Sequence, residues 1–150
     1  MGTSEVDELL EMLDHESETV GLNAAYKLGS IPEAAPRIVH ILSSDSELAR
    51  HNAGYALSTM GEHAVEYLVG TLEDTSDRTR TIAVKLLGNL GPVARSSASR
   101  VAQAMEDGCP DVRDQTAEAL GNFEVTDSVV IQALIRGLGD PDERVRRNSA

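Results

Sequence analysis

The sequence predicts an all-α protein, a right-handed α–α superhelix (solenoid) of about five stacked helix-pair repeats. The first observation is a ten-residue frame that recurs about every thirty residues, with a leucine at its ninth position. The second is an arginine at the second position of the later frames. The third is apolar spacing of the helical period, with no sustained alternation. The frames begin at Val20, Ala49, Thr79 and Val112, with an unfinished copy at Val145; the leucines are Leu28, Leu57, Leu87 and Leu120, and the arginines are Arg50, Arg80, Arg113 and Arg146.

Each frame is interpreted as the first helix of a pair. In the second copy, Ala53, Ala56, Leu57 and Met60 fall on one helical face. Glycines lie at or near the ends of these helices, where a left-handed cap residue is easily accommodated; they are Gly29, Gly61, Gly91 and Gly121. We expect first helices near residues 17–29, 46–60, 77–90, 110–122 and 142–150.

The second helix of each pair carries two apolar residues four positions apart and is followed by an acidic turn. This spacing places both side chains on one helical face. The apolar pairs are Ile38/Leu42, Leu68/Leu72, Val101/Met105 and Leu134/Leu138. We expect second helices near residues 34–43, 63–73, 93–106 and 127–138.

Residues 4–13 predict a capping helix that begins the array. Ser4 and Asp7 resemble a capping box, and the acidic residues of this segment give it the polar outer face that a terminal repeat needs. The whole chain, residues 1–150, is then one array. Its units are expected near residues 1–13, 14–44, 45–74, 75–107 and 108–140, with an incomplete unit at 141–150.

Composition excludes several classes of protein. The hydrophobic content of 41% suits a packed interior and excludes a disordered chain, and no apolar run has the roughly 20 residues that a membrane span needs. The net charge of −12 disfavours nucleic acid and anionic membranes as partners. Cys109 is the single cysteine, and the N-terminus lacks the features of a secretion signal, so a cytoplasmic location is expected.

Two segments carry a resemblance to a known family. Residues 107–121 read Asp-Gly-Cys-Pro-Asp-Val-Arg-Asp-Gln-Thr-Ala-Glu-Ala-Leu-Gly, and residues 139–146 read Gly-Asp-Pro-Asp-Glu-Arg-Val-Arg. On these motifs, nearly the whole chain resembles the armadillo-like HEAT-like repeat proteins of the phycobilisome-lyase (PBS lyase) type. The resemblance implies the helical-repeat fold. It implies no single chemistry, because the family includes scaffolds, lyases and hydroxylases.

The resemblance also implies a ladder along the stack, formed in that family by the turn aspartate and the frame arginine. Asp45 and Arg50 match it approximately, whereas the first repeat has Gly21 in place of the arginine. We interpret the ladder as structural, because it recurs from unit to unit, as a catalytic site would not. Its pairs are Asp74/Arg80, Asp107/Arg113 and Asp140/Arg146.

Candidate catalytic residues do not form a site in this sequence. Residues 50–57 resemble one repeat of deoxyhypusine hydroxylase, which holds two irons with His-Glu pairs in several repeats. Here the pair is His51-Asn52, and the equivalent pairs in the other repeats contain neither His nor Glu. A metal site needs several convergent ligands. His15, His63 and Cys109 lack a positioned partner. We therefore predict no catalytic residue, no cofactor and no metal site.

The second helices offer a candidate binding surface. In a stack of helix pairs they line the concave side, and residues outside their apolar stripe face the groove. These positions are neutral to basic and partly aromatic although the chain is acidic; those selected are Arg37, His40, His63, Tyr67, Arg100, Gln103 and Arg136.

We predict a non-enzymatic scaffold that binds a protein partner in this groove. One alternative is an auxiliary subunit of a bilin lyase-type enzyme that attaches chromophores. Another is an alkylpurine DNA glycosylase of HEAT-like architecture, which needs a strongly basic concave face with aromatic residues. The net charge of −12 argues against this last function.

The array is expected to be incomplete at its C-terminal end. The last frame stops at Ala150, before the Ala-Leu-Gly that closes other copies. We expect an apolar patch there, which favours either a longer natural protein or a homo-oligomer joined through this end. Its residues are Ile131, Leu134, Ile135 and Leu138.

Overall fold

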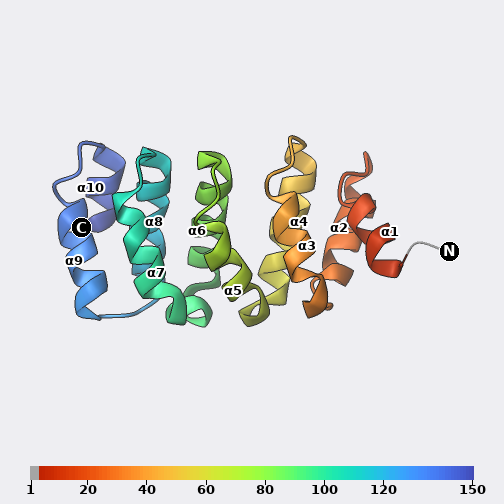
Figure 1. The fold of residues 1–150 in the computed structure, drawn as a ribbon, viewed down its shortest axis with the longest axis horizontal. Helices are drawn as coiled ribbons and strands as arrows, with labels where there is room; N and C mark the ends of the chain where they lie inside the picture. Colours follow the sequence, from red (N-terminus) through yellow and green to blue (C-terminus); the bar gives the residue numbers. More distant parts are fainter. Residues whose placement is uncertain (1–3) are drawn as a thin grey trace. The chain divides into compact units, whose positions relative to one another are not determined.

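The computed structural model describes residues 4–150, and every regular element in that range is a helix, so the all-α class is confirmed. The α-helices are α1 (Glu5–Met12), α2 (Glu18–Leu28), α3 (Ala35–Ile41), α4 (Glu47–Met60), α5 (Glu62–Thr71), α6 (Asp77–Leu90), α7 (Ala98–Gln103), α8 (Pro110–Asn122), α9 (Ser128–Gly137) and α10 (Glu143–Ser149) (Figure 1). Short 3₁₀ helices are η1 (Pro32–Ala34), η2 (Gly91–Ser97) and η3 (Ala104–Glu106).

The chain divides into two compact units, and each is described by itself. The first unit extends to Tyr67 and the second runs from Leu68 to Ala150, so the division falls within α5. Within each unit, first helices pack against the neighbouring first helices, and second helices pack against first helices that adjoin them in the chain. This is the arrangement of an α–α solenoid. The repeat boundaries within a single array stay a prediction.

In the first unit, α2 and α4 lie against each other and are flanked by α1 and α3. Leu13, Leu28 and Leu57 are fully buried between them. The polar side chain of Asn52 is buried as well, and its amide donates a hydrogen bond of 2.8 Å to the carbonyl oxygen of Leu13. Because a buried polar group is costly without a partner, this bond fixes the end of α1 against α4.

The predicted capping box of the first helix is confirmed. The hydroxyl of Ser4 accepts a hydrogen bond from the backbone N–H of Asp7, and the carboxylate of Asp7 accepts one from the backbone N–H of Ser4. Two backbone donors that the helix cannot satisfy internally are thereby satisfied.

In the second unit, the first helices α6, α8 and α10 lie side by side in chain order, and the second helices α7 and α9 pack on them and on each other (Figure 1). Leu87, Leu120 and Phe123 are buried between the layers. The approach of α6 to α8 is close: a Cβ added at Gly88 would lie 2.9 Å from the Cβ of Ala119. Small residues in the repeated frame therefore set the distance between first helices.

One expectation about local structure is wrong. Residues 93–106 are not one α-helix, because only Ala98–Gln103 is α-helical and 3₁₀ turns flank it. Pro92 lacks a backbone donor at the start of this segment, and the hydroxyl of Ser97 bonds the carbonyl oxygen of Ala94 at 2.6 Å, which competes with regular helix bonding.

The expectation of left-handed glycine caps holds only in part. Gly61 and Gly91 have φ of +63° and +58° after α4 and α6, so the positive φ agrees with the prediction, but their ψ of −127° and −135° lies outside the left-handed helical region. Gly29 is right-handed, and Gly121 lies within α8, where the left-handed residue that follows is Glu124 at φ +55°. Gly29 is instead needed for packing, since a Cβ there would lie 2.7 Å from the Cβ of Thr59.

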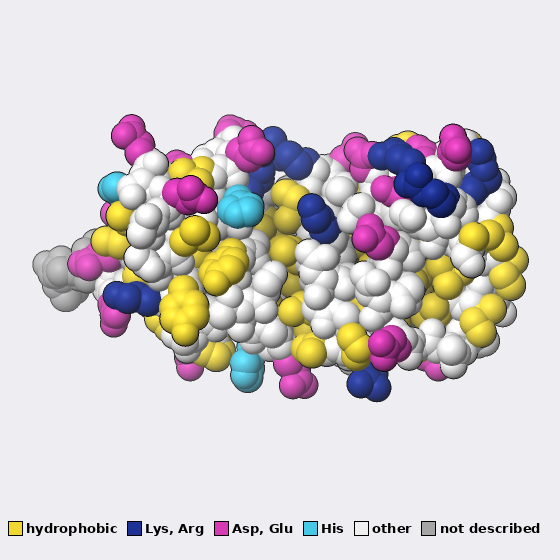
Figure 2. All heavy atoms as spheres, turned by 180° about the vertical axis from the view of Figure 1, so that it is seen from behind, with side chains coloured by type: hydrophobic (Ala, Val, Ile, Leu, Met, Phe, Trp, Pro, Cys, Tyr) yellow, Lys and Arg dark blue, Asp and Glu magenta, His cyan; other side chains and the backbone are white. Residues whose placement is uncertain are grey.

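Acidic side chains are widely distributed over the surface. Figure 2 views the molecule from behind Figure 1 and shows acidic side chains spread along this face, mixed with arginine and lysine. Hydrophobic side chains gather at the right-hand edge, where the C-terminal helices lie.

Candidate functional site

A hollow in the first unit brings two of the predicted surface residues together. Its volume is about 480 Å³, and it lies beside α1 and α3. Arg37 forms an ion pair with Asp7 of α1. The hydrogen bonds from Ser4 and then from Arg37 lower the pKa of Asp7 to about 2. The lining residues are Leu10, Pro36, Arg37, His40, Ile41 and Ser44.

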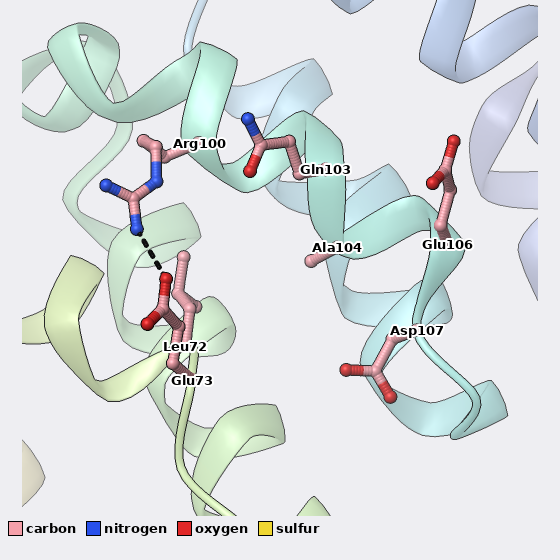
Figure 3. A pocket seen from close by; sticks show the side chains of 7 residues that line it. All are labelled: Leu72, Glu73, Arg100, Gln103, Ala104, Glu106 and Asp107. Carbon is pink, nitrogen blue, oxygen red and sulfur yellow. Dashed lines mark hydrogen bonds and ion pairs between the residues drawn. The ribbon is translucent and has the colours of Figure 1, made fainter.

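A second hollow, of about 220 Å³, lies in the second unit beside the end of α5 and along α7 and η3 (Figure 3). Arg100 also forms an ion pair, with an acid that follows α5: its Nη2 lies 3.0 Å from Oε1 of Glu73. The lining residues are Leu72, Glu73, Arg100, Gln103, Ala104, Glu106 and Asp107.

The two hollows are built from equivalent positions of the repeat. Arg37, His40, Ile41 and Ser44 in the first unit correspond to Arg100, Gln103, Ala104 and Asp107 in the second, two repeats later. Each hollow is therefore lined by an arginine, Arg37 or Arg100, and by the polar residue one helical turn after it, His40 or Gln103. The chemistry differs, because the first hollow holds no acid in its lining and the second holds three.

The remaining predicted surface residues are exposed but line neither hollow. His63 and Tyr67 lie on α5, and the side chain of Tyr67 is 40% exposed. Arg136 lies exposed on α9 and has no ion-pair partner among residues 4–150. The α9 position equivalent to Arg100 holds Ala133, which is buried. At this repeat position, α9 therefore contributes no polar side chain to the second-helix surface.

Sequence reasoning missed the acidic side of the second hollow. Glu73 follows α5, Glu106 ends η3 and Asp107 comes directly after it. Asp107 had been predicted only as a ladder residue, and neither glutamate was selected. The repeated acidic turn after each second helix was the signal that could have placed them there. Exposed Tyr26 and Tyr55, at equivalent positions of α2 and α4, were also not selected.

The frame arginines join consecutive turns of the second unit. The Nε and Nη2 atoms of Arg80 donate to the two carboxylate oxygens of Asp107, at 2.8 and 3.0 Å. Its Nη1 donates to the backbone carbonyl of Asp74, in its own turn, at 2.8 Å. One guanidinium thus holds two turns together with bidentate geometry on the second.

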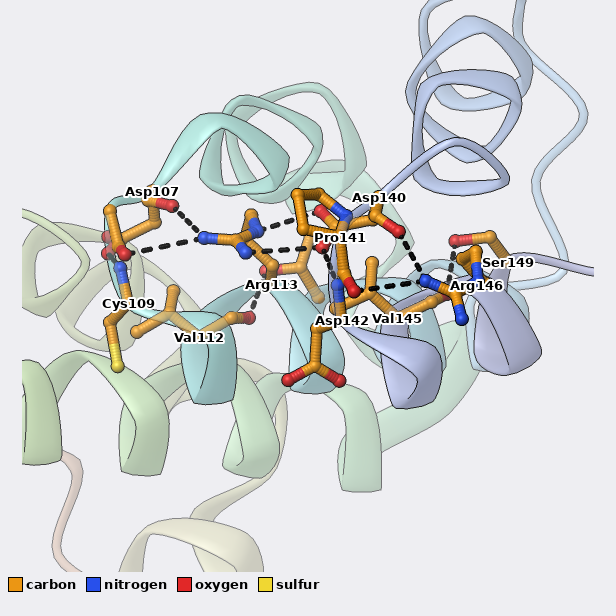
Figure 4. A network of polar contacts seen from close by, with 12 residues as sticks. Asp107, Cys109, Val112, Arg113, Asp140, Pro141, Asp142, Val145, Arg146 and Ser149 are labelled. Atoms are coloured by element: carbon orange, nitrogen blue, oxygen red, sulfur yellow. Dashed lines mark hydrogen bonds and ion pairs between the residues drawn. The ribbon is translucent and has the colours of Figure 1, made fainter.

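The next frame repeats this arrangement. Arg113 donates to the carboxylate of Asp140 at 2.8 and 3.1 Å, and to the carbonyl of Asp107 at 2.8 Å (Figure 4). Arg146 donates to the carbonyl of Asp140 at 2.7 Å. In the first unit, Arg50 makes the equivalent carbonyl contacts to Ser44 and Asp45, at 2.7 and 3.0 Å.

The ladder pairs are mostly shielded from water. The side chains of Arg113 and Asp140 are only 14% and 9% exposed. Hydrogen bonds from Arg113 hold the pKa of Asp140 below its ordinary value. Burial is the largest single effect on Asp107 and raises its pKa, but the hydrogen bonds from Arg80 and from the backbone N–H of Cys109, with the charges of Arg80 and Arg113, together lower the net pKa. We infer a structural role, because the donors of these arginines are used by the turns.

Residues 4–150 contain neither a metal-binding cluster nor a membrane-spanning helix. No three or more His, Cys, Asp or Glu side chains in that range lie together in a way that could hold a metal ion. None of the helices described there is both long and apolar enough to cross a membrane.

Solved structures resemble this chain in fold. In the complex of CpcE and CpcF of phycocyanin lyase from Nostoc sp. PCC7120, one chain is 17% identical; the match covers 96% of this chain and 95% of that chain, with a TM-score of 0.70. A designed armadillo repeat protein in complex with a (KR)4 peptide is 19% identical, over 96% of this chain and 78% of that chain, with a TM-score of 0.59. At these identities the likeness shows the fold alone.

Sequence comparison assigns the chain to a family, which the structural likeness does not. No curated protein matches the sequence. The family of HEAT repeats matches residues 6–88 and 65–150, which together span almost the whole chain. The helix pairs, the stacked first helices and the recurring turn contacts all agree with that match. The chain therefore belongs to the HEAT-repeat family.

Proposed function

We propose that this protein is a non-enzymatic HEAT-like repeat scaffold that binds a protein partner on the surface of its second helices. The observation that carries the proposal is the recurrence of one hollow, at equivalent repeat positions, in both units. A surface that repeats with the fold suits an extended partner segment, which also repeats along its length. The predicted single array over residues 1–150 is part of this proposal.

The chemistry of the second-helix surface supports protein binding. Arginine and tyrosine are over-represented among residues that carry binding energy, and Arg37, Arg100 and Tyr67 are all exposed there. Arg37 and Arg100 are held by neighbouring carboxylates, so less side-chain freedom is lost on binding. Protein partners also occur among the similar structures, as a peptide in one and a second subunit in another.

The test begins with partners captured from the native lysate and identified by mass spectrometry, followed by affinity measurements with purified components. Arg37→Glu, Arg100→Glu and Arg136→Glu should each weaken binding and leave the melting temperature nearly unchanged, because exposed charges contribute little to stability. Tyr67→Ala should be the most damaging single change. Matched controls are Lys85→Glu and Tyr26→Ala, which alter exposed residues of the first helices.

Equal affinity of the second-helix variants and the parent for a verified partner would refute this assignment. If Tyr26→Ala weakened binding instead, the interface would lie on the first-helix face, and the second-helix arginines would serve only solubility.

A second candidate function is an auxiliary subunit of a bilin lyase-type enzyme. The phycocyanin lyase structure favours it, since its match covers nearly the full length of both chains. This candidate predicts tight binding of a tetrapyrrole or of a bilin-bearing protein, measurable as a shift in the visible absorption spectrum. Unchanged bilin spectra at saturating protein, with and without a companion subunit, would exclude it.

The proposal includes a cytoplasmic location and no resident cofactor. Cys109 is the single cysteine and has no partner for a disulfide within the chain. A reducing compartment would keep this thiol intact. Fractionation of the native cell with an antibody to the protein tests the location.

A further inference from the structure

The hollow of the first unit, of about 480 Å³, combines an apolar wall with hydrogen-bond donors. Leu10 comes from α1, and Pro36 and Ile41 come from α3, so both helices line it. Arg37 and His40 supply the donors, and no acidic side chain among residues 4–150 is part of the lining. This composition suits a ligand that is apolar in one part and accepts hydrogen bonds in another.

Arg37 has donors that the fold does not use. Among residues 4–150 its guanidinium makes one polar contact, from Nη2 to Oδ1 of Asp7, and half of its side chain is exposed. The ladder arginine Arg80, in contrast, donates through Nε, Nη1 and Nη2 to neighbouring turns. The Nε and Nη1 atoms of Arg37 are therefore available to a ligand, and a guanidinium forms its strongest paired hydrogen bonds with a carboxylate.

Asp7 is an internal carboxylate that already binds this guanidinium. The side chains of Arg37 and Asp7 are 50% and 35% exposed, and ion pairs at such exposure are held weakly. A carboxylate from another molecule can therefore compete with Asp7 for Arg37.

The second hollow, at equivalent repeat positions, has the opposite preference. Glu73, Glu106 and Asp107 line it, so an entering carboxylate would meet like charges there. A basic side chain in the first hollow would instead lie beside Arg37 with no acid in the lining to balance it. Because the net charge of −12 opposes an acidic partner over the rest of the surface, the ligand of the first hollow is a short acidic segment.

We propose that the first hollow binds an acidic side chain of a protein partner, presented beside a large apolar side chain of the same segment. The inference rests on the proposed function, because it names the partner chemistry for one part of the second-helix surface. The carboxylate accepts hydrogen bonds from Arg37 and from a ring N–H of His40, while the apolar neighbour packs on Leu10 and Ile41. Asp7 is then an internal competitor, and its removal should strengthen binding.

The experiment is an NMR titration of the isotope-labelled chain with blocked pentapeptides of sequence Ala-Leu-X-Leu-Ala, in which X is glutamate, glutamine or lysine. The glutamate peptide should shift signals of residues 36–44 and bind at least about fivefold more tightly than the glutamine peptide, because only the carboxylate forms charge-assisted hydrogen bonds. The lysine peptide should leave these signals unchanged. Arg37→Gln should abolish the preference for glutamate. Equal affinity for the glutamate and glutamine peptides, or unchanged signals up to about 10 mM glutamate peptide, would overturn the inference.

Three variants test the role of Asp7 and of charge. Asp7→Asn should tighten binding of the glutamate peptide about threefold, because it releases Arg37 from an exposed pair. Ser4→Ala is its control, since it removes the helix cap and leaves the pair in place; equal tightening by Ser4→Ala would contradict the competition. Arg95→Gln removes another exposed arginine, which lines neither hollow, and should not change binding. A loss equal to that of Arg37→Gln would indicate a general charge effect and overturn the inference.

The proposed function and this inference fail in different ways. A verified partner whose binding is weakened by Arg100→Glu and Tyr67→Ala but unaffected by Arg37→Gln would keep the second-helix surface and overturn the acidic ligand. A partner whose affinity no second-helix variant changes would refute the proposed function, and the peptide titration would still decide whether the hollow takes a carboxylate.

Discussion

Replacement of Arg113 by methionine measures how much one arginine of the ladder contributes to the free energy of unfolding. Methionine keeps much of the apolar stem of the arginine and removes the guanidinium. The change deletes the bidentate contact to Asp140, at 2.8 and 3.1 Å, and the 2.8 Å bond to the carbonyl of Asp107. The Asp140 carboxylate, which is only 9% exposed, then keeps the hydrogen bond from the backbone N–H of Asp142.

The magnitude follows from the burial of the pair. Removing one partner of a fully buried ion pair costs about 3–5 kcal/mol, whereas an exposed pair contributes at most about 1 kcal/mol. The Arg113–Asp140 pair lies near the buried limit but keeps some contact with water, so we expect a loss of about 2–3 kcal/mol. For a chain of this length that loss lowers the melting temperature by roughly 10 °C.

The assay is urea unfolding followed by circular dichroism, combined with a double-mutant cycle. Arg113→Met, Asp140→Asn and the double variant should give a coupling energy of at least about 1.5 kcal/mol, since the two side chains contact each other directly. Arg144→Met is the control, because the side chains of Arg144 and Asp111 are exposed and that of Asp142, at 21%, is more exposed than that of Asp140. A loss for Arg113→Met no larger than for Arg144→Met would refute the structural interpretation of the ladder.

Two further predictions concern pH and packing. The pKa of Asp140 is lowered in the folded state, so its stabilising contribution is present above about pH 4 and is lost as the pH falls further; the stability difference between the parent and Arg113→Met should therefore shrink below pH 4 in acid unfolding followed by circular dichroism. Gly88 and Gly121 hold equivalent repeat positions, but a Cβ at Gly88 would lie 2.9 Å from Ala119 Cβ, whereas one at Gly121 would contact nothing within 4 Å. Gly88→Ala should cost about 1–3 kcal/mol and Gly121→Ala should gain about 0.5–1 kcal/mol in urea unfolding, and effects of the same sign would contradict the packing described for α6 and α8.

The sequence by itself determined the helices and their order. The 3.6-residue period and the recurring frame depend on residues within one or two turns of each other, so first helices such as Asp77–Leu90 agree closely with the predicted 77–90. The capping box at Ser4 and Asp7 is local in the same sense. Local chemistry was less decisive where proline and serine cluster, and there the predicted helix over 93–106 is interrupted by 3₁₀ turns.

Only the tertiary structure decided which side chains meet across repeats. Arg80 and Asp107 are 27 residues apart, and their bidentate contact arises because stacking brings the turn of the next repeat beside the frame arginine. The same stacking places Glu73, Glu106 and Asp107 around one hollow with Arg100, a grouping that the repeat pattern did not predict. It also makes Gly88 a contact point and leaves the equivalent Gly121 open. The period of a sequence specifies each repeat, whereas the distance and offset between neighbouring repeats depend on side-chain packing across them, which the period does not contain.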